Sequence, residues 1–482
     1  MSDALSISGS SDWESPLTTK GKLRQYYAAV SVYITALCSG IAMAWTSPLS
    51  ERLLGKEGTY APLTRRLTDE ELSWVSSVVN LGAMLGSILV GFTMDRFGRK
   101  RTLLALGGIP SAVGWIITLF ATNAASLYAA RFLVGISTGV SSLVAPTYIA
   151  EISSPSLRGS LSSILQIMLN LGVMVPFCIG PYASYQVLAG VSLIFPFLFL
   201  IALFPLPETP YHLLANKKSE EAVSSLAWFR GEEPSASTKE RLGQMTEEIQ
   251  ELGSHGLINS FKDLFHSRGN RLALLVVTGA MITLQYCGIN IIVYNEVSIF
   301  LGSAQNNKPL LPASQSAMVT GAVQNVASWV TVAIVDRTGR RPLMMLSAGL
   351  TSLALLALGT QSYLEINNYP AAASLSWLPV TSLMIYVAAF SFGLGPLTWV
   401  ILSELFTSGA KSSAALLEGT FSWFLAFVVT RTYLPMLEKM YTYGVYWFYS
   451  AGAAVGFVFL AVMLPETKCR TLEAVHKQLL RR

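Results

Sequence analysis

The hexapeptide Asp95-Arg96-Phe97-Gly98-Arg99-Lys100 follows a long uncharged tract, and Asp336-Arg337-Thr338-Gly339-Arg340-Arg341 follows another, 241 residues further along the chain. The tripeptide Pro207-Glu208-Thr209 is repeated as Pro465-Glu466-Thr467, and each copy again follows an uncharged tract. Internal similarity at a long fixed spacing is typical of a chain built from repeated units. These two pairs of motifs therefore indicate that the chain consists of two similar halves.

A third pattern lies between the two motifs of each half. Glu151 precedes Arg158 by seven residues, and Glu404 precedes Lys411 by the same interval. The three patterns occur in one order in both halves, which predicts a duplicated architecture. Transporters built from such repeats bind their substrate near the middle of the bilayer, between the repeats.

The composition is that of a membrane protein. Of 482 residues, 52% are hydrophobic and 13% are charged, whereas soluble domains carry about 25% charged residues. A transmembrane helix needs roughly 20 apolar residues to cross about 30 Å of hydrocarbon. Single spans are predicted in the tracts 25–50, 72–94, 272–295, 309–335, 343–364, 366–403, 412–434 and 440–465, and two spans each in 102–150 and 159–207.

We therefore predict an all-α membrane protein with twelve transmembrane helices in two pseudo-symmetric bundles of six. Helices are expected because lipid offers no hydrogen-bond partner to an open backbone. The predicted order is a disordered cytoplasmic tail, a six-helix bundle, a small cytoplasmic helical domain, a second six-helix bundle and a cytoplasmic tail, over residues 1–24, 25–207, 208–271, 272–465 and 466–482. A plain solvated linker is the alternative for the central segment.

The basic residues set the predicted orientation. With the N-terminus in the cytoplasm, 25 of the 33 Lys and Arg residues lie on the cytoplasmic side and six outside, while Arg131 and Arg431 lie within spans. This bias predicts that both termini are cytoplasmic. The net charge of +5 then reflects membrane topology and not a nucleic-acid-binding surface. We expect a multi-pass protein of the cell membrane, treated as a monomer within the lipid bilayer.

Neither a metal site nor a cofactor is indicated by the sequence. The four cysteines, Cys38, Cys178, Cys287 and Cys469, are scattered, with neither metal-ligand spacing nor a disulfide framework. We find no catalytic constellation, and the long apolar spans exclude a soluble enzyme.

Taken together, the motifs resemble those of the sugar porter family of the major facilitator superfamily, over nearly the whole chain. Besides the two hexapeptides, the resemblance rests on Pro-Thr-Tyr-Ile-Ala-Glu at 146–151, Arg158-Gly159, Gln285 with Gly288-Ile289-Asn290, and Pro465-Glu466-Thr467-Lys468. The tract 393–399 looks like the family's broken tenth helix. Within the family, the chain looks most like insect-type trehalose and hexose facilitators. The resemblance implies uniport of a small sugar, trehalose or a hexose, by alternating access.

A sugar site needs amide and hydroxyl side chains for hydrogen bonds and an aromatic ring for stacking. Fixed charges suit it less, because a neutral solute cannot offset their desolvation. Asn290 and Tyr294 are four residues apart and share one helix face. By resemblance, the substrate-binding residues are Gln166, Gln285, Asn290, Tyr294 (at the outer gate), Gln324 and Trp399. The alternative for each amide is a structural hydrogen bond to a neighbouring helix.

Four positions depart from the family pattern. Leu284 replaces the first glutamine of a Gln-Gln pair, and Gln324 replaces an asparagine of the eighth span. Ser391 replaces a glutamate before the break in the tenth helix, and Ser422 replaces an asparagine of the eleventh span. These departures put glucose itself in doubt and leave a disaccharide such as trehalose open.

The charged motif residues have a separate predicted role. By resemblance, they form salt bridges at the cytoplasmic helix ends that close an inner gate when the site faces outward, and they release it when the site faces inward. Anchoring of helices at the lipid headgroups is the alternative. The predicted gate residues are Asp95, Arg96, Arg99, Lys100, Glu151, Arg158, Asp336, Arg337, Arg340, Arg341, Glu404 and Lys411.

Energy coupling requires an ionisable group inside the membrane. Sugar–proton symporters of the family carry an Asp in the first span, whereas residues 25–50 contain no acid, and Arg131 in the fourth span lacks that partner. This favours facilitated transport. Glu418 in the eleventh span keeps a proton-coupled symporter open, although a structural bond to a neighbouring helix is the favoured role. A transport-inactive sugar sensor acting through 208–271 or the tails is the third alternative.

Overall fold

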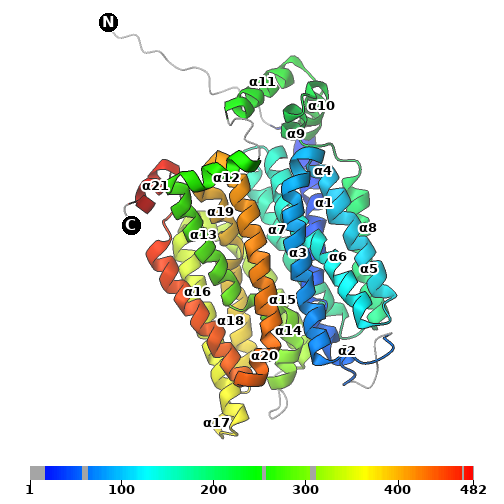
Figure 1. Ribbon diagram of the computed structural model, residues 1–482, viewed down its shortest axis with the longest axis vertical. Coiled ribbons are helices and arrows are strands. Elements are labelled where there is room, and N and C mark those ends of the chain that lie inside the picture. Colours follow the sequence, from blue (N-terminus) through cyan, green and yellow to red (C-terminus); the bar gives the residue numbers. More distant parts are fainter. Residues whose placement is uncertain are drawn as a thin grey trace.

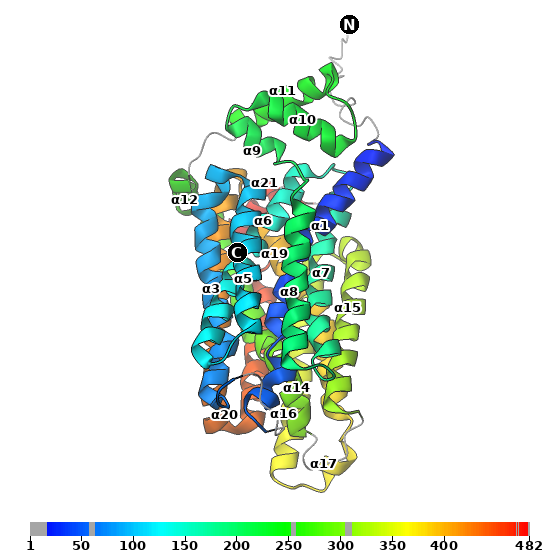
Figure 2. The ribbon, with the colours of Figure 1, turned by 90° about the vertical axis from the view of Figure 1, so that its right-hand side faces the viewer.

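The computed structural model describes residues 17–56, 63–251, 257–303, 311–468, 470 and 472–480, and every regular element in these ranges is a helix. Figure 1 shows two groups of long helices side by side, with several short helices at one end. We call this end the linker end and the opposite end, where α17 lies, the α17 end. Figure 2 shows that the long helices run between these two ends.

The number of spans follows from the lengths of the helices. Eleven helices of the described residues are long and apolar enough to cross a membrane. The last covers Gly409–Met463 and has 55 residues, enough for two spans. Its backbone leaves the helical conformation at Tyr441, where φ is 56°, and Figure 1 shows α20 as two arms running in opposite directions. The total is therefore twelve spans, and the predicted fold class is confirmed.

The first half contains six spans, and the third includes a short π-helical stretch near its start. They are α1 (Thr19–Ala44), α3 (Asp69–Phe97), α4 (Arg99–Thr102) continued by η3 (Leu103–Gly108) and α5 (Ile109–Leu119), α6 (Ala124–Ile152), α7 (Arg158–Ile179) and α8 (Tyr185–Leu203). Two short elements follow α1 at the α17 end, namely η2 (Ser47–Leu49) and α2 (Ser50–Leu53).

Four short helices follow at the linker end, and the second half comes after them. The short helices are α9 (Pro210–Ala215), α10 (Ser219–Arg230), α11 (Ala236–Glu251) and α12 (Leu257–His266). The second half comprises α13 (Arg268–Tyr286), α14 (Ile289–Ser303), α15 (Ala313–Thr338), α16 (Arg340–Ile366), α17 (Ala371–Ser374), α18 (Leu378–Phe392), α19 (Leu394–Leu405), α20 (Ser408–Met463) and α21 (Leu472–Leu480).

Two spans of the second half are interrupted. Gly288, with φ of +86°, separates α13 from α14, a conformation that glycine adopts far more easily than other residues. Gly393 separates α18 from α19 with φ −144° and ψ −78°. The predicted break of the tenth helix is therefore confirmed. Each interruption frees backbone groups inside a span, an arrangement that membrane proteins tolerate where the chain is buried in protein or lines a cavity.

Small residues let neighbouring spans approach closely. A Cβ atom on Gly139 of α6 would lie 1.9 Å from the Ala83 carbonyl oxygen of α3. A Cβ atom on Gly40 of α1 would lie 2.1 Å from the Leu169 carbonyl oxygen of α7. Lipid provides no hydrophobic force between helices, so close backbone packing of this kind holds membrane bundles together.

The short linker helices are attached to different halves. At α10, the Arg230 and Phe229 carbonyl oxygens accept hydrogen bonds from Thr18 (2.7 Å) and Gln25 (3.2 Å), which flank the start of α1. At α12, the Ser260 carbonyl oxygen accepts a bond of 3.0 Å from Ser413 of α20. The linker end therefore carries one group of helices on the first half and another on the second.

Two boundaries differ from the sequence prediction. Helix α1 begins at Thr19, inside the segment 1–24 expected to be a disordered tail, because the Thr18 hydroxyl accepts a bond from the Gly21 N–H and caps the helix. The turn expected between residues 434 and 440 is instead continuous helix up to Tyr441. Residues 1–16 and Cys469 lie outside the described ranges.

Candidate functional site

One cluster of predicted substrate residues lies where α13 gives way to α14. The turn at Gly288 brings the side chains of Gln285 and Asn290 together, and the Asn290 amide donates a hydrogen bond of 2.5 Å to Gln285 Oε1. Gln285 Nε2 in turn donates to the Ser422 hydroxyl of α20 over 2.9 Å. Serine at this departure from the family pattern thus still supplies a polar contact. Both amides are more than 90% buried.

Tyr294 lies one helical turn beyond Asn290 and reaches across to the first half. Its hydroxyl donates a bond of 3.2 Å to Asn80 Oδ1 on α3. Asn80 Nδ2 donates a second bond of 3.2 Å, to the Thr430 hydroxyl of α20. Asn80 is 1% exposed, so one buried amide of the first half holds two helices of the second.

A second cluster joins α7 of the first half to α15 of the second, with Asn170 at its centre. Gln166 Nε2 and Gln324 Nε2 both donate to Asn170 Oδ1, over 3.0 Å and 3.3 Å. Asn170 Nδ2 donates to the Ser328 hydroxyl over 2.6 Å, and the Asn170 carbonyl oxygen accepts a bond from Asn325 Nδ2. Gln166 and Gln324 therefore belong to one network although they lie in opposite halves.

Trp399 lies apart from these networks. It is half-buried in the middle of α19, the helix that follows the Gly393 break, and it packs against the hydrophobic core of the second half. In the part of the chain that the structure describes, no hydrogen bond links its indole to either amide cluster. Ser391, on the other side of the same break, is buried and its carbonyl oxygen accepts a bond of 3.0 Å from Thr331.

Asn80 and Asn170 were missed by the sequence analysis. Each is an amide within an uncharged predicted span, and polar residues in such positions are commonly functional or join helices. That signal was present, but it does not tell which neighbouring helix an amide contacts.

The charged motif of the first half surrounds the turn at Gly98. The Glu208 carboxylate accepts bonds of 3.0 Å from the backbone N–H groups of Arg99 and Lys100. The Arg99 guanidinium pairs with Glu151 at 3.0 Å and with the exposed Asp95 at 3.5 Å. His212 of α9 packs against the same group, and burial lowers the pKa of its imidazole.

The second half repeats this arrangement almost bond for bond. The Glu466 carboxylate accepts bonds from the backbone N–H groups of Arg340 (3.0 Å) and Arg341 (3.2 Å), and Arg340 pairs with Glu404 at 3.2 Å. Partial burial raises the pKa of Glu466, but the backbone N–H groups of Lys468, Arg340 and Arg341 outweigh it and leave the pKa below its usual value. The side chains of Asp336 and Arg337 lie outside the described part of the structure.

The remaining motif bases make contacts of their own. The Arg96 guanidinium lies over the Phe97 ring, and the Lys100 ammonium donates to the Phe204 carbonyl oxygen. Arg341 donates to the Ala461 carbonyl oxygen. Among the described residues, Arg158 and Lys411 form no ion pair. Glu151 therefore does not pair with Arg158, and Glu404 does not pair with Lys411. The ion pairs of Glu151 and Glu404 stay within one half.

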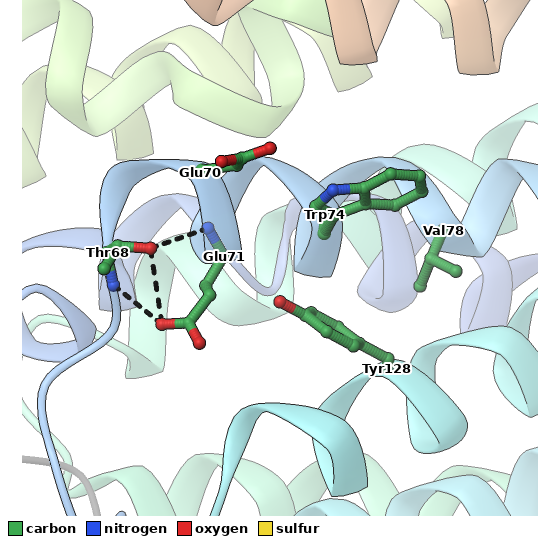
Figure 3. A pocket seen from close by; sticks show the side chains of 6 residues that line it. All are labelled: Thr68, Glu70, Glu71, Trp74, Val78 and Tyr128. Atoms are coloured by element: carbon green, nitrogen blue, oxygen red, sulfur yellow. Dashed lines mark hydrogen bonds between the residues drawn. The ribbon is translucent and has the colours of Figure 1, made fainter.

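At the α17 end, by contrast, an ion pair joins the halves. Arg431 of α20 pairs with Glu70 of α3 at 3.0 Å and lies over the Trp74 ring at 4.8 Å. Trp74 and Glu70 also line a hollow of about 650 Å³ with Thr68, Glu71, Val78 and Tyr128, shown in Figure 3. The hydrogen bonds drawn there between Thr68 and Glu71 cap the start of α3. None of the predicted substrate residues lines this hollow.

Arg131 and Glu418 are ionisable residues that lie buried within the spans. Arg131 is 0% exposed; it donates to the Val75 and Ala42 carbonyl oxygens and lies over the Trp45 ring. Glu418 of α20 accepts a bond of 2.5 Å from the Thr278 hydroxyl of α13. This contact joins α13 and α20, which both belong to the second half.

Comparison with known proteins agrees with this architecture. The facilitated trehalose transporter Tret1 of Apis mellifera ligustica is 30% identical over 456 residues, which cover 94% of this chain and 88% of that protein. Tret1 of Bombyx mori is 30% identical over 455 residues, 94% of this chain and 86% of that protein.

Solved structures show the same fold. The proton:xylose symporter XylE bound to 6-bromo-6-deoxy-D-glucose superposes with a TM-score of 0.74 at 21% identity, over 95% of this chain and 99% of that one. A partially occluded inward open conformation of XylE from E. coli gives 0.73 at 21% identity, over 92% and 100%. The family pattern described as "Sugar (and other) transporter" matches residues 27–479. This multi-pass membrane protein of twelve spans in two matched halves therefore belongs to the sugar transporter family, with the major facilitator fold.

Proposed function

We propose that the chain carries a small uncharged sugar, trehalose or a hexose, across the cell membrane by facilitated alternating access. The observation that supports this most is the pair of amide clusters around Gln285–Asn290 and around Asn170. Both are built from neutral hydrogen-bonding groups in the middle of spans, and the second joins the two halves. Such groups can exchange their mutual bonds for sugar hydroxyls without exposing a buried charge.

The orientation follows from the basic residues. The linker end carries the motif bases, the start of α1 and helix α21, so we assign it to the cytoplasm. The polar bonds at the α17 end then close the outer side, and the structure corresponds to a carrier whose outer gate is shut. The relatives' names favour trehalose, and the altered polar positions Gln324 and Ser422 agree with a substrate other than glucose.

Uniport is favoured by the state of Arg131. A fourth-span arginine that pairs with a first-span acid could exchange protons with it, but Arg131 is instead bound by two backbone carbonyl groups and the Trp45 ring. Helix α1 contributes no acid to this neighbourhood. The cycle we propose therefore moves sugar down its gradient.

Reconstitution tests the proposal directly. Purified protein in liposomes should take up labelled trehalose, glucose or fructose in a saturable manner that stops at equal concentrations on the two sides. A proton gradient should not make the uptake concentrative. Accumulation above equilibrium would replace uniport by symport, with Glu418→Gln as the variant that should then abolish it, and binding without flux would indicate a sensor.

Matched variants test the site. We expect Gln285→Ala, Asn290→Ala and Trp399→Leu to lose most uptake. Asn295→Ala is the control. Asn295 lies on the same helix as Asn290, but among the described residues its amide donates only to the Ile291 carbonyl oxygen of its own helix. Equal uptake by the Asn290 and Asn295 variants would remove the Gln285–Asn290 cluster from the substrate site.

A further inference from the structure

A second buried carboxyl, Glu296, lies on α14 and has no role in the site described above. The uncharged tract 272–295 ends one residue before Glu296, so the sequence predicts that Glu296 lies at the edge of a span. In the structure it is 3% exposed, the Thr320 hydroxyl of α15 lies against it, and its Oε1 has no hydrogen-bond partner among the described residues.

The helix that carries Glu296 closes the α17 end. The next two residues bond to the first half: the Val297 N–H donates to Ser47 Oγ over 3.0 Å, and the Ser298 and Ser50 hydroxyls lie 2.9 Å apart. Opening this end requires both bonds to break. The interruption at Gly288 lets α14 move separately from α13. Glu296 therefore lies on the element whose movement opens the gate.

Among the described residues, no charged group on the neighbouring elements forms an ion pair with Glu296. Helix α14 packs against α1, η2, α2, α13, α15, α18 and α20. In the described parts of these elements, no ion pair reaches Glu296: Arg52 donates to the Gly180, Pro181 and Ala183 carbonyl oxygens, and Arg431 pairs with Glu70. The other charged residues on them are Lys20, Lys22, Arg24, Glu51, Arg268, Arg271, Asp336, Arg337, Lys411, Glu418, Glu438 and Lys439.

A carboxylate buried without a cation is strongly disfavoured, so the closed gate favours the neutral acid. We propose that Glu296 is a proton-binding site of the outer gate: its carboxylate takes up one proton when α14 closes and releases it to the same side when α14 opens. The balance is one proton bound and one released per cycle on the outer side, with no net proton transfer. This inference rests on the proposed alternating-access function and adds a ligand to its gate.

The sign of the resulting pH dependence is fixed. Lower external pH protonates Glu296 and favours the closed gate, whereas higher external pH favours the open gate with an ionised carboxylate. Because one proton is involved, the closed-to-open ratio changes by at most about tenfold per pH unit.

Gate opening can be measured without sugar. Ser298→Cys places a thiol at the gate contact, and its labelling by a membrane-impermeant maleimide in sealed cells is read after subtracting the labelling of the parent protein. Between external pH 6 and 8, labelling of Ser298→Cys should rise more when Glu296 is present than when it is replaced in Glu296→Gln. The Glu296→Gln protein carries the same thiol, so it also corrects for the effect of pH on the labelling reaction itself. Glu296→Asp should retain the pH-dependent difference, and Glu418→Gln, the other buried acid, should retain it in full.

Transport provides the second measurement. In the parent protein, the rate of sugar entry at fixed internal pH should change with the external pH. In Glu296→Gln, the external pH should change this rate less than twofold. A pH response of Glu296→Gln equal to that of the parent in both assays would overturn the inference, and sugar accumulation driven by an inward proton gradient would overturn release to the same side. Absence of sugar flux at every pH would reject the proposed function instead, while the labelling result would still decide on Glu296.

Discussion

The two ends of the molecule are held by different interactions. At the α17 end, polar contacts cross between the halves: Asn80 bonds Tyr294 and Thr430, and Glu70 pairs with Arg431. At the linker end, the ion pairs centred on Glu151 and Glu404 stay within one half each. One end is therefore joined across the interface, and the other has its charges satisfied separately on either side.

This difference indicates what each end contributes to movement. At the linker end, the Glu208 and Glu466 carboxylates are bound by backbone N–H groups at sharp turns. We therefore expect the charged turn of each half to move as a rigid unit. The α17 end relies mainly on single bonds of side chains, each of which contributes about 1 kcal/mol. We therefore expect changes at the linker turns to affect stability and changes at the α17 end to affect the gate equilibrium.

The largest effect is expected at the linker-end turns. Gly98 has φ of +97° and ψ of 165°, a region that costs other residues about 1–3 kcal/mol, and a Cβ atom there would lie 2.3 Å from Glu208 Oε2. Gly98→Ala should clearly lower the thermal unfolding temperature in detergent. Gly159→Ala is the control, because a Cβ atom there meets no atom within 4 Å. Equal unfolding temperatures for the two variants would contradict a rigid turn.

The next effect is expected at the α17 end. Asn80→Ala removes two buried bonds between the halves, worth together about 2 kcal/mol, or about a 30-fold shift towards the open gate. Labelling of Ser298→Cys from outside should rise accordingly. Asn295→Ala, which among the described residues breaks a bond only within α14, should leave labelling unchanged. If both variants label alike, the bonds of Asn80 do not hold the gate.

A smaller, pH-dependent effect should come from Glu466. Because its pKa is lowered in the folded protein, its contribution to stability is complete above the pKa of the unfolded chain and is lost as pH falls through the folded value. Unfolding temperatures measured between pH 7 and pH 4 should fall less steeply in Glu466→Gln than in the parent protein. Glu438→Gln, at an exposed position of α20, should show the same pH dependence as the parent protein. If the unfolding temperatures of all three proteins change with pH in parallel, protonation of Glu466 does not contribute to the pH dependence of stability.

The smallest effect should follow from Glu70→Gln. The Glu70 side chain is 71% exposed, and surface ion pairs contribute about 0–1 kcal/mol, so gate labelling should change by less than about fivefold. Salt should abolish even this change through screening. A shift as large as that of Asn80→Ala would show that the surface pair, and not the buried amide, closes this end.

The sequence was sufficient for features that depend on local pattern or on repetition. Ten apolar tracts predicted the twelve spans, and the repeated hexapeptides each contain a glycine, Gly98 and Gly339, that adopts a positive φ, +97° and +93°. Gln285 and Asn290 were named by resemblance, and their contact in the structure is a local one across the Gly288 turn.

Contacts between distant helices could not be predicted in the same way. Asn170 bonds Ser328, 158 residues away, and Asn80 bonds Thr430, 350 residues away. Such pairings depend on the rotation of each helix about its axis, which an apolar span with little amphipathic character does not reveal. Glu296 was overlooked for a different reason, because a charged residue next to an uncharged run is expected at the membrane surface, whereas α14 continues and buries it.

The attachment of α10 to the first half and of α12 to the second has a practical consequence. Any rotation of one bundle against the other must change the separation of these two short helices, even if neither of them takes part in transport. Exposed positions exist on both, such as Ser224 and Lys262. A pair of fluorescent dyes at these positions would report the angle between the bundles from the aqueous side, without any probe in the bilayer or near the sugar.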